Sequence, residues 1–419
     1  MGRIIKLSKR LVASGAMLAS AGVLAQGLFT TTAHAANVEC SSLAGVVYVS
    51  GSSAVKPVLA GLGAKLTPLG TTIVYFSQGS CVGVNAALGT AQTAGTTGTY
   101  WDATSGAAGK TCDQTAAQVV DIGVSDVFAT SCPTVTAAAL TTAGLKDFDT
   151  YFAQVMNFVV PGGAGGSDQT AISAEAAYLT FGLGDNGATP WNNKALFAIR
   201  NSGSGTQTML GKAIGLDASK WIGVNTAMGS MGVFNDLKGR INPTDSSAAD
   251  PKKLIGILAS NEADADPVAV KKLAFQATGQ TCAYWPDSGV AEKDKAYVRD
   301  GHYPVWGPLH LLTKASAQGV PTNAGAKVVL DAFGKLDQDI LDVEINANVV
   351  PLCAMNVTRD EEVGPLSSIQ PTGACGCYFD SKRKTGGAGT ECKVCTEANA
   401  ATVCTGARTK CNYGFCEVK

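Results

Sequence analysis

Short apolar runs that end in a Gly/Ser turn and lead into a helical pattern recur along this chain, and this repeat constrains its fold most. Residues 46–49 form such a run, followed by a polar turn at 51–54 and apolar residues at helical spacing over 55–66. A second unit begins at 72–76 and has its turn at 78–80. Alternating strands and helices are typical of parallel-rich sheets covered by helices, so we predict an α/β fold.

The same pattern continues through the rest of the body. An apolar strand over 154–160 stops at Pro161, a suitable crossing point into a second lobe, and an extended segment at 304–312 returns to the first lobe. We therefore expect a two-lobe architecture with a hinge. The other expected elements are a strand at 119–124, a strand at 195–199 with a helix at 207–214, and a helix at 323–333.

The length of the chain also favours more than one lobe. A chain of 419 residues is too long for one compact core. The stretch at 89–118 is rich in Gly, Thr and Ala, and we expect a surface insertion there, stapled by Cys112 and Cys132. The expected parts are a signal peptide at 1–35, lobe 1 at 36–157, lobe 2 at 158–303, a return to lobe 1 at 304–352, and a cysteine-rich C-terminal segment at 353–419.

The first 35 residues have the features of an export signal. Four basic residues precede a mostly apolar run at 11–29, and Ala33-His34-Ala35 is the small-x-small pattern that a signal peptidase cuts, so we expect cleavage after Ala35. A membrane anchor is the alternative, but serines, a glutamine and glycines dilute the run below what a span of about 20 residues requires. The residues before Cys40 do not fit a lipid-modified cysteine. We predict a soluble protein of the periplasm or the cell surface.

Charge excludes one class of partner. The chain has 32 Lys and Arg against 33 Asp and Glu, and cleavage after Ala35 removes four basic residues and no acidic ones. The remaining chain is slightly acidic and carries no basic stripe, so we expect no nucleic-acid partner.

Thirteen cysteines indicate an oxidising compartment, where such residues form disulfides. Because the number is odd, at least one thiol is free or bonded to another chain. Cys392 and Cys395 have the spacing of a zinc pair, but the tail contains no histidine, so we favour disulfides there. The body contains Cys40, Cys81, Cys112, Cys132 and Cys282, and the end contains Cys353, Cys375, Cys377, Cys392, Cys395, Cys404, Cys411 and Cys416.

Four polar turns carry groups suited to an anion, at 51–54, 79–81, 125–126 and 200–206. A helix start presents unpaired backbone N–H groups and a positive dipole end, and hydroxyl side chains beside it add donors. Glycine lets the main chain approach closely. Helix capping alone explains a single Ser/Gly turn. Several such turns together indicate one shared anion site.

Arg200 and Asp126 sharpen this hypothesis. The planar guanidinium of Arg200 matches two oxygens of a tetrahedral oxyanion. The Asp126 carboxylate would repel an anion unless the ligand carries a proton, which phosphate can donate near neutral pH and sulfate cannot. The alternative is that Asp126 only caps a turn or pairs with Arg200.

These motifs resemble those of the phosphate-binding proteins of bacterial ABC transporters. Residues 51–59 are similar to the opening motif of that family, residues 78–83 to its second Gly-Ser turn, and residues 121–129 to the stretch whose aspartate accepts the phosphate proton. Residues 200–206 match the family's Arg-x-x-Gly-Ser-Gly-Thr, with Trp191-Asn192 upstream where the family has a Trp-Asn pair. Order and spacing agree from about residue 46 to about residue 350.

The resemblance implies a type 2 periplasmic binding fold that captures one inorganic phosphate between its lobes, without catalysis, cofactor or metal, and works with an ABC permease. Ser202 stands where the family has an acidic residue that orients the arginine, Ala54 replaces a hydroxyl, and Cys81 replaces a small residue. These departures leave sulfate or molybdate as alternative ligands. The ligand residues implied by position are Ser52, Ser53, Ala54, Ser80 and Asp126 on one wall, and Arg200, Ser204, Gly205 and Thr206 on the other.

Two other classes of function compete with a binding protein. An enzyme is poorly supported, because residues 36–419 contain only His302 and His310, no Gly-x-Ser-x-Gly elbow and no evident His/Asp metal cluster. We expect His302 to be a packed or hinge-side residue. A surface or structural protein is the other alternative, supported by the segment from Cys353 onward. This segment lacks hydrophobic periodicity, so we expect it to bury no core, to be held by cross-links, and either to dock on an envelope partner or to protect the terminus.

Overall fold

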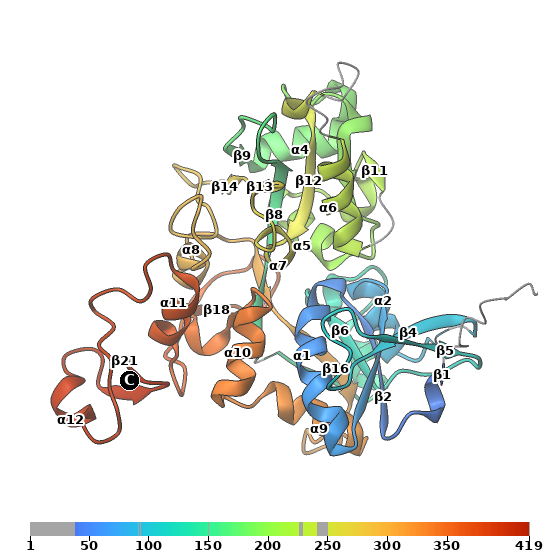
Figure 1. Cartoon of the computed structure of the whole chain (residues 1–419). Helices are drawn as coiled ribbons and strands as arrows, with labels where there is room; N and C mark the ends of the chain where they lie inside the picture. The colour runs from blue at the N-terminus through green and yellow to red at the C-terminus, as the bar shows by residue number, and fades with distance from the viewer. Residues whose placement is uncertain are drawn as a thin grey trace, which may run out of the picture. The chain divides into compact units, whose positions relative to one another are not determined.

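The computed structural model describes residues 38–90, 92, 94–149, 151–225, 229–240 and 250–418. Two large sheets with helices make up most of these residues, and a disulfide-rich segment follows (Figure 1). The predicted α/β class with a disulfide-rich tail is therefore confirmed. The expected signal at 1–35 and its cleavage site lie outside the described residues. Within the described residues, no helix combines the length and apolar character needed to cross a membrane.

The first sheet has eight strands in the order β1-β5-β4-β3-β2-β6-β16-β7. Its central strands β2, β3 and β6 run parallel, and each is followed by one of the polar turns predicted from the sequence. The strands are β1 (Val38–Glu39), β2 (Val46–Gly51), β3 (Thr72–Ser77), β4 (Thr96–Tyr100), β5 (Lys110–Gln114), β6 (Ile122–Ser125), β7 (Leu145–Phe148) and β16 (His310–Lys314). The helices of this region are α1 (Lys56–Leu66), α2 (Ser80–Ala87), α3 (Ala137–Thr142), α9 (Ala324–Phe333) and α10 (Gln338–Asn346).

Helix α9 shows how the sequence sets both the start and the packing of a helix. Asn323 is its N-cap, and its side-chain oxygen accepts from Ala326 N at 2.9 Å. Its buried apolar residues recur at spacings of three and four and join the same cluster as α1 and strand β2. The buried residues are Ala326, Val329, Leu330, Ala332 and Phe333, and the helix predicted at 323–333 is confirmed.

The predicted surface insertion at 89–118 contains an antiparallel hairpin, and its described residues from 102 to 111 are mostly exposed. Strands β4 and β5 pair with each other, and β4 pairs with β3, so the stretch extends the first sheet. The expected Cys112–Cys132 staple is wrong, because Cys112 bonds Cys40 and Cys132 bonds Cys81. Strand β1 pairs with β5, and this pairing brings Cys40, the residue after β1, close to Cys112. The Thr- and Gly-rich strands lack the apolar alternation that would have indicated them in the sequence.

The second sheet has the order β11-β10-β12-β8-β13, and β15 and β17 also pair with β8. Strand β8 is buried along its whole length, and β10 runs parallel to β11 and β12. The strands are β8 (Phe152–Pro161), β10 (Phe197–Ile199), β11 (Val224–Asn225), β12 (Ile255–Ala259), β13 (Val270–Lys272), β15 (Trp306–Pro308) and β17 (Val350–Pro351), and β9 (Ala171–Ser173) pairs with β14 (Ala274–Gln276). The helices are α4 (Ala174–Leu183), α5 (Gly205–Ile214), α6 (Gly229–Gly239), α7 (Ser260–Ala263) and α8 (Ala296–Arg299).

The chain passes from the first sheet into the second at β8 and returns to the first through β15, which leads into β16. We call the segment with β15 the return crossing. The first half of β8 pairs with β15 and β17, and its second half pairs with β12 and β13. The extended return segment predicted at 304–312 is present as β15 and the start of β16. The lobe boundaries at 157/158 and 303/304 stay a prediction.

The C-terminal segment contributes to the core, contrary to the expectation that it buries none. Tyr378 and Phe379 of helix α11 (Gly376–Arg383) are 3% and 1% exposed and belong to the largest apolar cluster of the described chain. The segment is also cross-linked, as expected, by Cys353–Cys375, Cys377–Cys392, Cys395–Cys411 and Cys404–Cys416. Its elements are β18 (Val357–Thr358), β19 (Ser367–Ser368), α11 (Gly376–Arg383), α12 (Ala400–Val403), β20 (Lys410–Asn412) and β21 (Phe415–Glu417).

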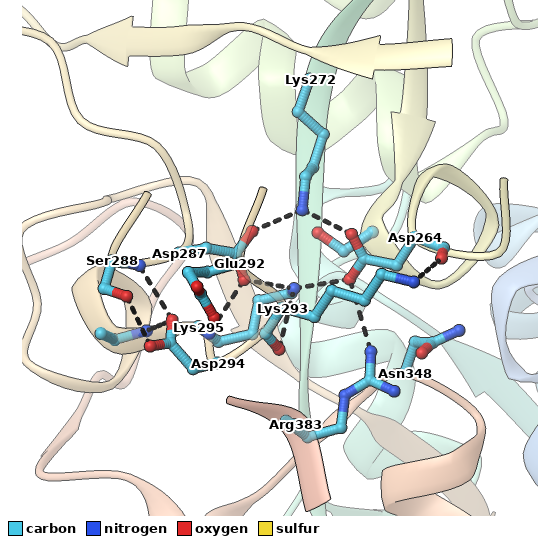
Figure 2. Close-up of polar contacts among 12 residues, drawn as sticks. Asp264, Lys272, Asp287, Ser288, Glu292, Lys293, Asp294, Lys295, Asn348 and Arg383 are labelled. Atoms are coloured by element: carbon cyan, nitrogen blue, oxygen red, sulfur yellow. Dashed lines mark hydrogen bonds and ion pairs between the residues drawn. The ribbon is translucent and has the colours of Figure 1, made fainter. Parts of the chain in front are cut away.

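Two lysines and two aspartates form a closed ion cluster beside α7 (Figure 2). Lys295 Nζ lies 2.5 Å from Asp264 and 2.7 Å from Asp287, and Lys272 contacts both carboxylates. All four side chains are at most 6% exposed. Arg383 of α11 approaches Asp264 at 3.9 Å, so the C-terminal segment reaches this cluster.

Candidate functional site

The turns that follow β2, β3 and β6 meet at one edge of the first sheet. Ser50 of β2 lies opposite Gly123 of β6 in a parallel ladder, so the carboxyl ends of these strands are adjacent. The Asp126 carboxylate accepts from Ser52 Oγ, which lies 2.5 Å from both of its oxygens, and from Ser80 Oγ at 3.2 Å. These three side chains are buried. The first predicted wall is therefore assembled around the Asp126 carboxylate.

Burial dominates the protonation of Asp126. It raises the pKa of this carboxyl, and the hydrogen bonds from Ser52 and Ser80 and the charge of Arg200 only partly oppose it. The side chain of Asp126 accepts from two hydroxyls rather than from the backbone of its own turn. Within the described ranges, no ion pair joins Asp126 to Arg200. Neither part of the alternative, a turn cap or a pair with Arg200, describes this geometry.

Arg200 is buried and contacts hydroxyls rather than carboxylates. Its side chain donates to Ser230 Oγ at 3.0 Å and to Ser53 Oγ at 3.5 Å, and the residue is 4% exposed. Burial lowers its pKa, and the charges of Glu262 and Asp126 partly offset this effect. Among the residues that the structure describes, no carboxylate forms an ion pair with this guanidinium. A buried cation without such a partner is suited to an anionic ligand.

The turn after β10 holds Arg200 through its own side chains. The Arg200 N–H donates to the side chain of Gln207 at 2.9 Å, and Asn201 accepts from Gly203 N at 3.0 Å. Ser204 is the N-cap of α5 and accepts from Gln207 N at 3.5 Å. Because its oxygen is the acceptor, the hydroxyl proton of Ser204 remains available to another group.

The two predicted walls are in contact. Cys81 N donates to Gly203 O at 3.0 Å, and a Cβ on Gly205 would lie 2.2 Å from Ser80 Oγ. Among the nine predicted residues, Ser52 hydrogen-bonds Asp126 and Ala54, and Ser80 hydrogen-bonds Asp126. Arg200 donates to Ser53. All nine are buried except Ser53, which is half-buried. Whether the nine residues contact a ligand stays a prediction.

Sequence reasoning missed four residues at this place. Asn261 and Glu262 lie within α7, and Asn261 Nδ2 donates to Ala54 O at 3.0 Å. Burial raises the pKa of Glu262 to about 8, and the charge of Arg200 only partly opposes this effect. The other two are Ser230, which contacts Arg200, and Tyr75, whose hydroxyl donates to Ser52 O. The signal was present for α7, because Ser260-Asn261-Glu262 follows a buried strand as the predicted turns do.

The departures from the family pattern have structural explanations at two positions. Ser202 is exposed, and none of the described hydrogen bonds joins it to the Arg200 side chain. Among the acidic residues, Glu262 has the largest effect on the pKa of Arg200. Cys81 bonds Cys132, which ties the start of α2 to the segment after Asp126. The hydroxyl missing at Ala54 has no substitute that we identify.

Neither His302 nor His310 forms a described hydrogen bond with a predicted site residue. His302 is exposed, with Asp300 2.8 Å from its Nδ1, so it is not buried in packing, and its expected place at the hinge stays a prediction. Its ring lies against Tyr284 and Tyr297 on the surface. His310 is fully buried, and its Nδ1 lies 2.8 Å from Asp147 Oδ2.

The cysteines follow the prediction of disulfides over zinc. Cys392 and Cys395 belong to separate disulfides, Cys377–Cys392 and Cys395–Cys411. Cys282 is the one unpaired thiol in the described chain, and it is exposed. The odd number of cysteines therefore leaves one free thiol, as expected.

Several solved structures that resemble this chain are named as phosphate-binding or phosphate-transport proteins. One from Clostridium perfringens, provisionally assigned as a phosphate ABC transporter substrate-binding protein and solved with bound phosphate, has 17% identity and a TM-score of 0.47, covering 73% of this chain and 99% of its own. An ABC-type phosphate transport receptor from Vibrio cholerae has 14% identity and a TM-score of 0.43, with coverages of 73% and 99%. A phosphate-binding protein from Stenotrophomonas maltophilia has 14% identity and a TM-score of 0.43, covering 73% of this chain and 90% of its own.

Searches by sequence find no counterpart. No family model matches the chain, and no curated protein matches it. The arrangement of residues within this chain, rather than the distant structural matches, carries the proposal below.

Proposed function

We propose that this protein is an exported solute-binding protein that captures inorganic phosphate for uptake through an ABC permease. One observation carries the proposal: two buried charged groups, Arg200 and Asp126, lie close enough to influence each other's charge. Within the described chain, the Arg200 guanidinium has no carboxylate partner. A buried cation needs an anion, and a carboxylate beside that anion needs a proton on it. Phosphate meets both requirements near neutral pH.

Helix starts add donors to the proposed site. α2 begins at Ser80 and α5 begins at Gly205, and a Cβ on Gly205 would lie only 2.9 Å from Ser80 Cβ. The first backbone N–H groups of a helix have no partner within the helix, and its dipole is positive there. Cys81 N and Gln207 N already donate to Gly203 O and Ser204 Oγ. We propose that the other first N–H groups of the two helices bind the phosphate oxygens together with Ser53, Ser204 and Thr206.

Asp126 makes phosphate the preferred oxyanion over sulfate and molybdate. Its charged carboxylate accepts hydrogen bonds, and hydrogen phosphate is the oxyanion that can donate one. Ser52 donates to this carboxylate. We propose that the proton of bound phosphate takes part of this role. Sulfate, which carries no proton at neutral pH, places a negative charge against Asp126 without such a bond.

Isothermal titration calorimetry of the protein from residue 36 onward tests the assignment. We expect one phosphate per chain and much weaker binding of sulfate and molybdate. Heat with sulfate or molybdate but none with phosphate would reject it. Arg200→Gln should weaken binding at least tenfold, since each bond from a charged donor contributes about 1.5 to 3 kcal/mol. Arg240→Gln is the matched control, because Arg240 pairs with Asp236 on α6 and lies outside the proposed site.

Export, lobe movement and the absence of catalysis belong to the same proposal. We propose that residues 1–35 are removed and that the lobes at 36–157 with 304–352 and at 158–303 close on the ligand about a hinge. Six disulfides in the described chain support an oxidising compartment. Mass spectrometry of the exported protein should give an N-terminus at Ala36. Incubation with phosphate monoesters should release no phosphate.

A further inference from the structure

The C-terminal segment reaches the turn that carries Asp126 through one carboxylate. Glu362 lies between β18 and β19, and its Oε2 accepts from Phe128 N at 3.0 Å and from Ser131 Oγ at 3.3 Å. Both donors belong to the turn that leaves β6 just after Asp126. A residue 236 positions later in the sequence than Asp126 therefore holds the backbone next to it.

Gly307 marks where the two carboxyl-bearing residues converge. A Cβ on Gly307 would lie 3.1 Å from Glu362 Oε1 and 3.4 Å from Asp126 O. Gly307 belongs to β15 in the return crossing, opposite Gln154 of β8. Glu362, the Asp126 backbone and the return crossing thus pack closely around one glycine, where a Cβ would be a tight fit.

Arg359 fixes the segment that carries Glu362. Its Nη1 donates to Pro304 O at 2.8 Å and to Trp306 O at 3.2 Å, and its guanidinium lies 4.4 Å from the Trp306 ring centre. The residue is 4% exposed. Because Arg359 is anchored to the return crossing, the position of Glu362 follows the crossing rather than a mobile surface loop.

The charged neighbours of Glu362 are few. His310 and Arg359 face it, and burial raises its pKa to about 7 while these charges partly oppose the effect. His310 lies opposite Ser125 in the sheet, its ring centre is 4.4 Å from that of Phe128, and Asp147 and Asp149 also act on it. The groups that act on Asp126 itself are Arg200 and His310.

We propose that Glu362 is a positioning residue for Asp126, supplied by the C-terminal segment, and that phosphate affinity depends on it. This inference rests on the proposed function. The Glu362 carboxylate fixes the turn 127–131 by accepting two hydrogen bonds, and this turn sets where the Asp126 carboxylate points. The cysteine-rich segment is then a working part of the binding site, neither a passive protector of the terminus nor only a dock for an envelope partner.

The inference also predicts a pH effect. A charged carboxylate accepts more strongly than a neutral carboxyl, so the turn is held best above the pKa of Glu362, about 7. The second ionisation of phosphate and the groups around Asp126 also titrate in this range. Their effects are shared by the wild type and its variants, so the difference between the proteins isolates Glu362.

The test is phosphate titration calorimetry of the full exported chain at pH 6 to 8.5. Glu362→Ala should weaken phosphate binding about tenfold, the loss expected for hydrogen bonds to a charged acceptor. Glu362→Gln keeps an acceptor oxygen without the charge, so its affinity should stay within about threefold at pH 6 and fall further behind the wild type at pH 8.5. Glu361→Ala, an exposed neighbour, should bind as the wild type does.

Hydrogen exchange separates positioning from a general loss of structure. In the ligand-free protein, Glu362→Ala should speed the exchange of the peptide 127–132 and leave that of α9 unchanged. Wild-type affinity in both Glu362 variants would overturn the inference, as would equal losses for Glu361→Ala and Glu362→Ala. A wild type that does not bind phosphate at all would instead reject the proposed function.

Discussion

Gly205 and Ser80 approach so closely that the glycine has no room for a side chain. A Cβ on Gly205 would lie 2.2 Å from Ser80 Oγ and 3.0 Å from Asp126 Cβ. Gly205 is the first residue of α5 and Ser80 is the first residue of α2, so the starts of two helices from different sheets meet at this point. The backbone of Gly205 is compatible with other residues, because its φ is not positive. The glycine is therefore required by the contact and not by the turn.

The first prediction concerns this contact. Gly205→Ala should weaken phosphate binding at least tenfold in calorimetry, because the added methyl group forces the two helix starts apart or displaces the Ser80 hydroxyl. Gly239→Ala is the control, since a Cβ on Gly239 would meet nothing within 4 Å. If Gly205→Ala bound phosphate as tightly as the control, the two helix starts would not form one site.

The second prediction concerns selectivity. Asp126→Asn removes the charged acceptor, so phosphate affinity should fall about 10- to 100-fold, corresponding to about 1.5 to 3 kcal/mol for a bond to a charged group. Sulfate binding should stay the same or improve, because the repelling carboxylate is gone. Competition titrations with both anions measure the ratio. Asp339→Asn, on the surface of α10, should leave the ratio unchanged. An unchanged ratio in Asp126→Asn would make Asp126 a structural residue only.

Local chemistry explains what the sequence could predict. Gly-Ser turns after β-branched runs, the helical pattern at 323–333, and an Arg at the end of a strand are all visible within short stretches of chain. They predicted the α/β class, the helix at 323–333 and the residues that gather around Asp126. Their clustering could be inferred because the carboxyl ends of parallel strands share one edge.

Contacts between residues far apart in sequence explain the rest. Ser230 and Glu362 contact Arg200 and Phe128 respectively, and no pattern around these positions indicates either contact. The cysteine pairing failed for the same reason, since it depends on β1 joining β5. The core residues of the C-terminal segment could not be recognised from the sequence, because Tyr378 and Phe379 are adjacent in a short helix without amphipathic spacing.

The third prediction concerns stability. Lys295 is 1% exposed and pairs with Asp264 and Asp287, which are both fully buried. Lys295→Met leaves the two carboxylates with too little positive charge, so we expect a loss of about 3 to 5 kcal/mol in the free energy of unfolding. Urea unfolding followed by circular dichroism measures the loss. Lys327→Met removes an exposed pair with Asp331 on α9 and should change the unfolding midpoint little. Equal midpoints for the two variants would contradict the prediction.

The last prediction concerns pH and Glu262. Burial raises the pKa of this carboxyl from about 4.5 to about 8 in the folded protein. Between these values the folded state binds a proton that the unfolded state has lost, so stability falls as pH rises. The Glu262→Gln side chain does not titrate, so the variant lacks this contribution to the pH dependence of stability. The melting temperature of the ligand-free wild type, measured relative to that of the variant, should therefore fall between pH 5 and pH 8 and level off above. Glu397→Gln, exposed in the C-terminal segment, controls for the amide. Parallel curves for the wild type and Glu262→Gln would show that this carboxyl stays charged, as a direct counter-ion of Arg200 would.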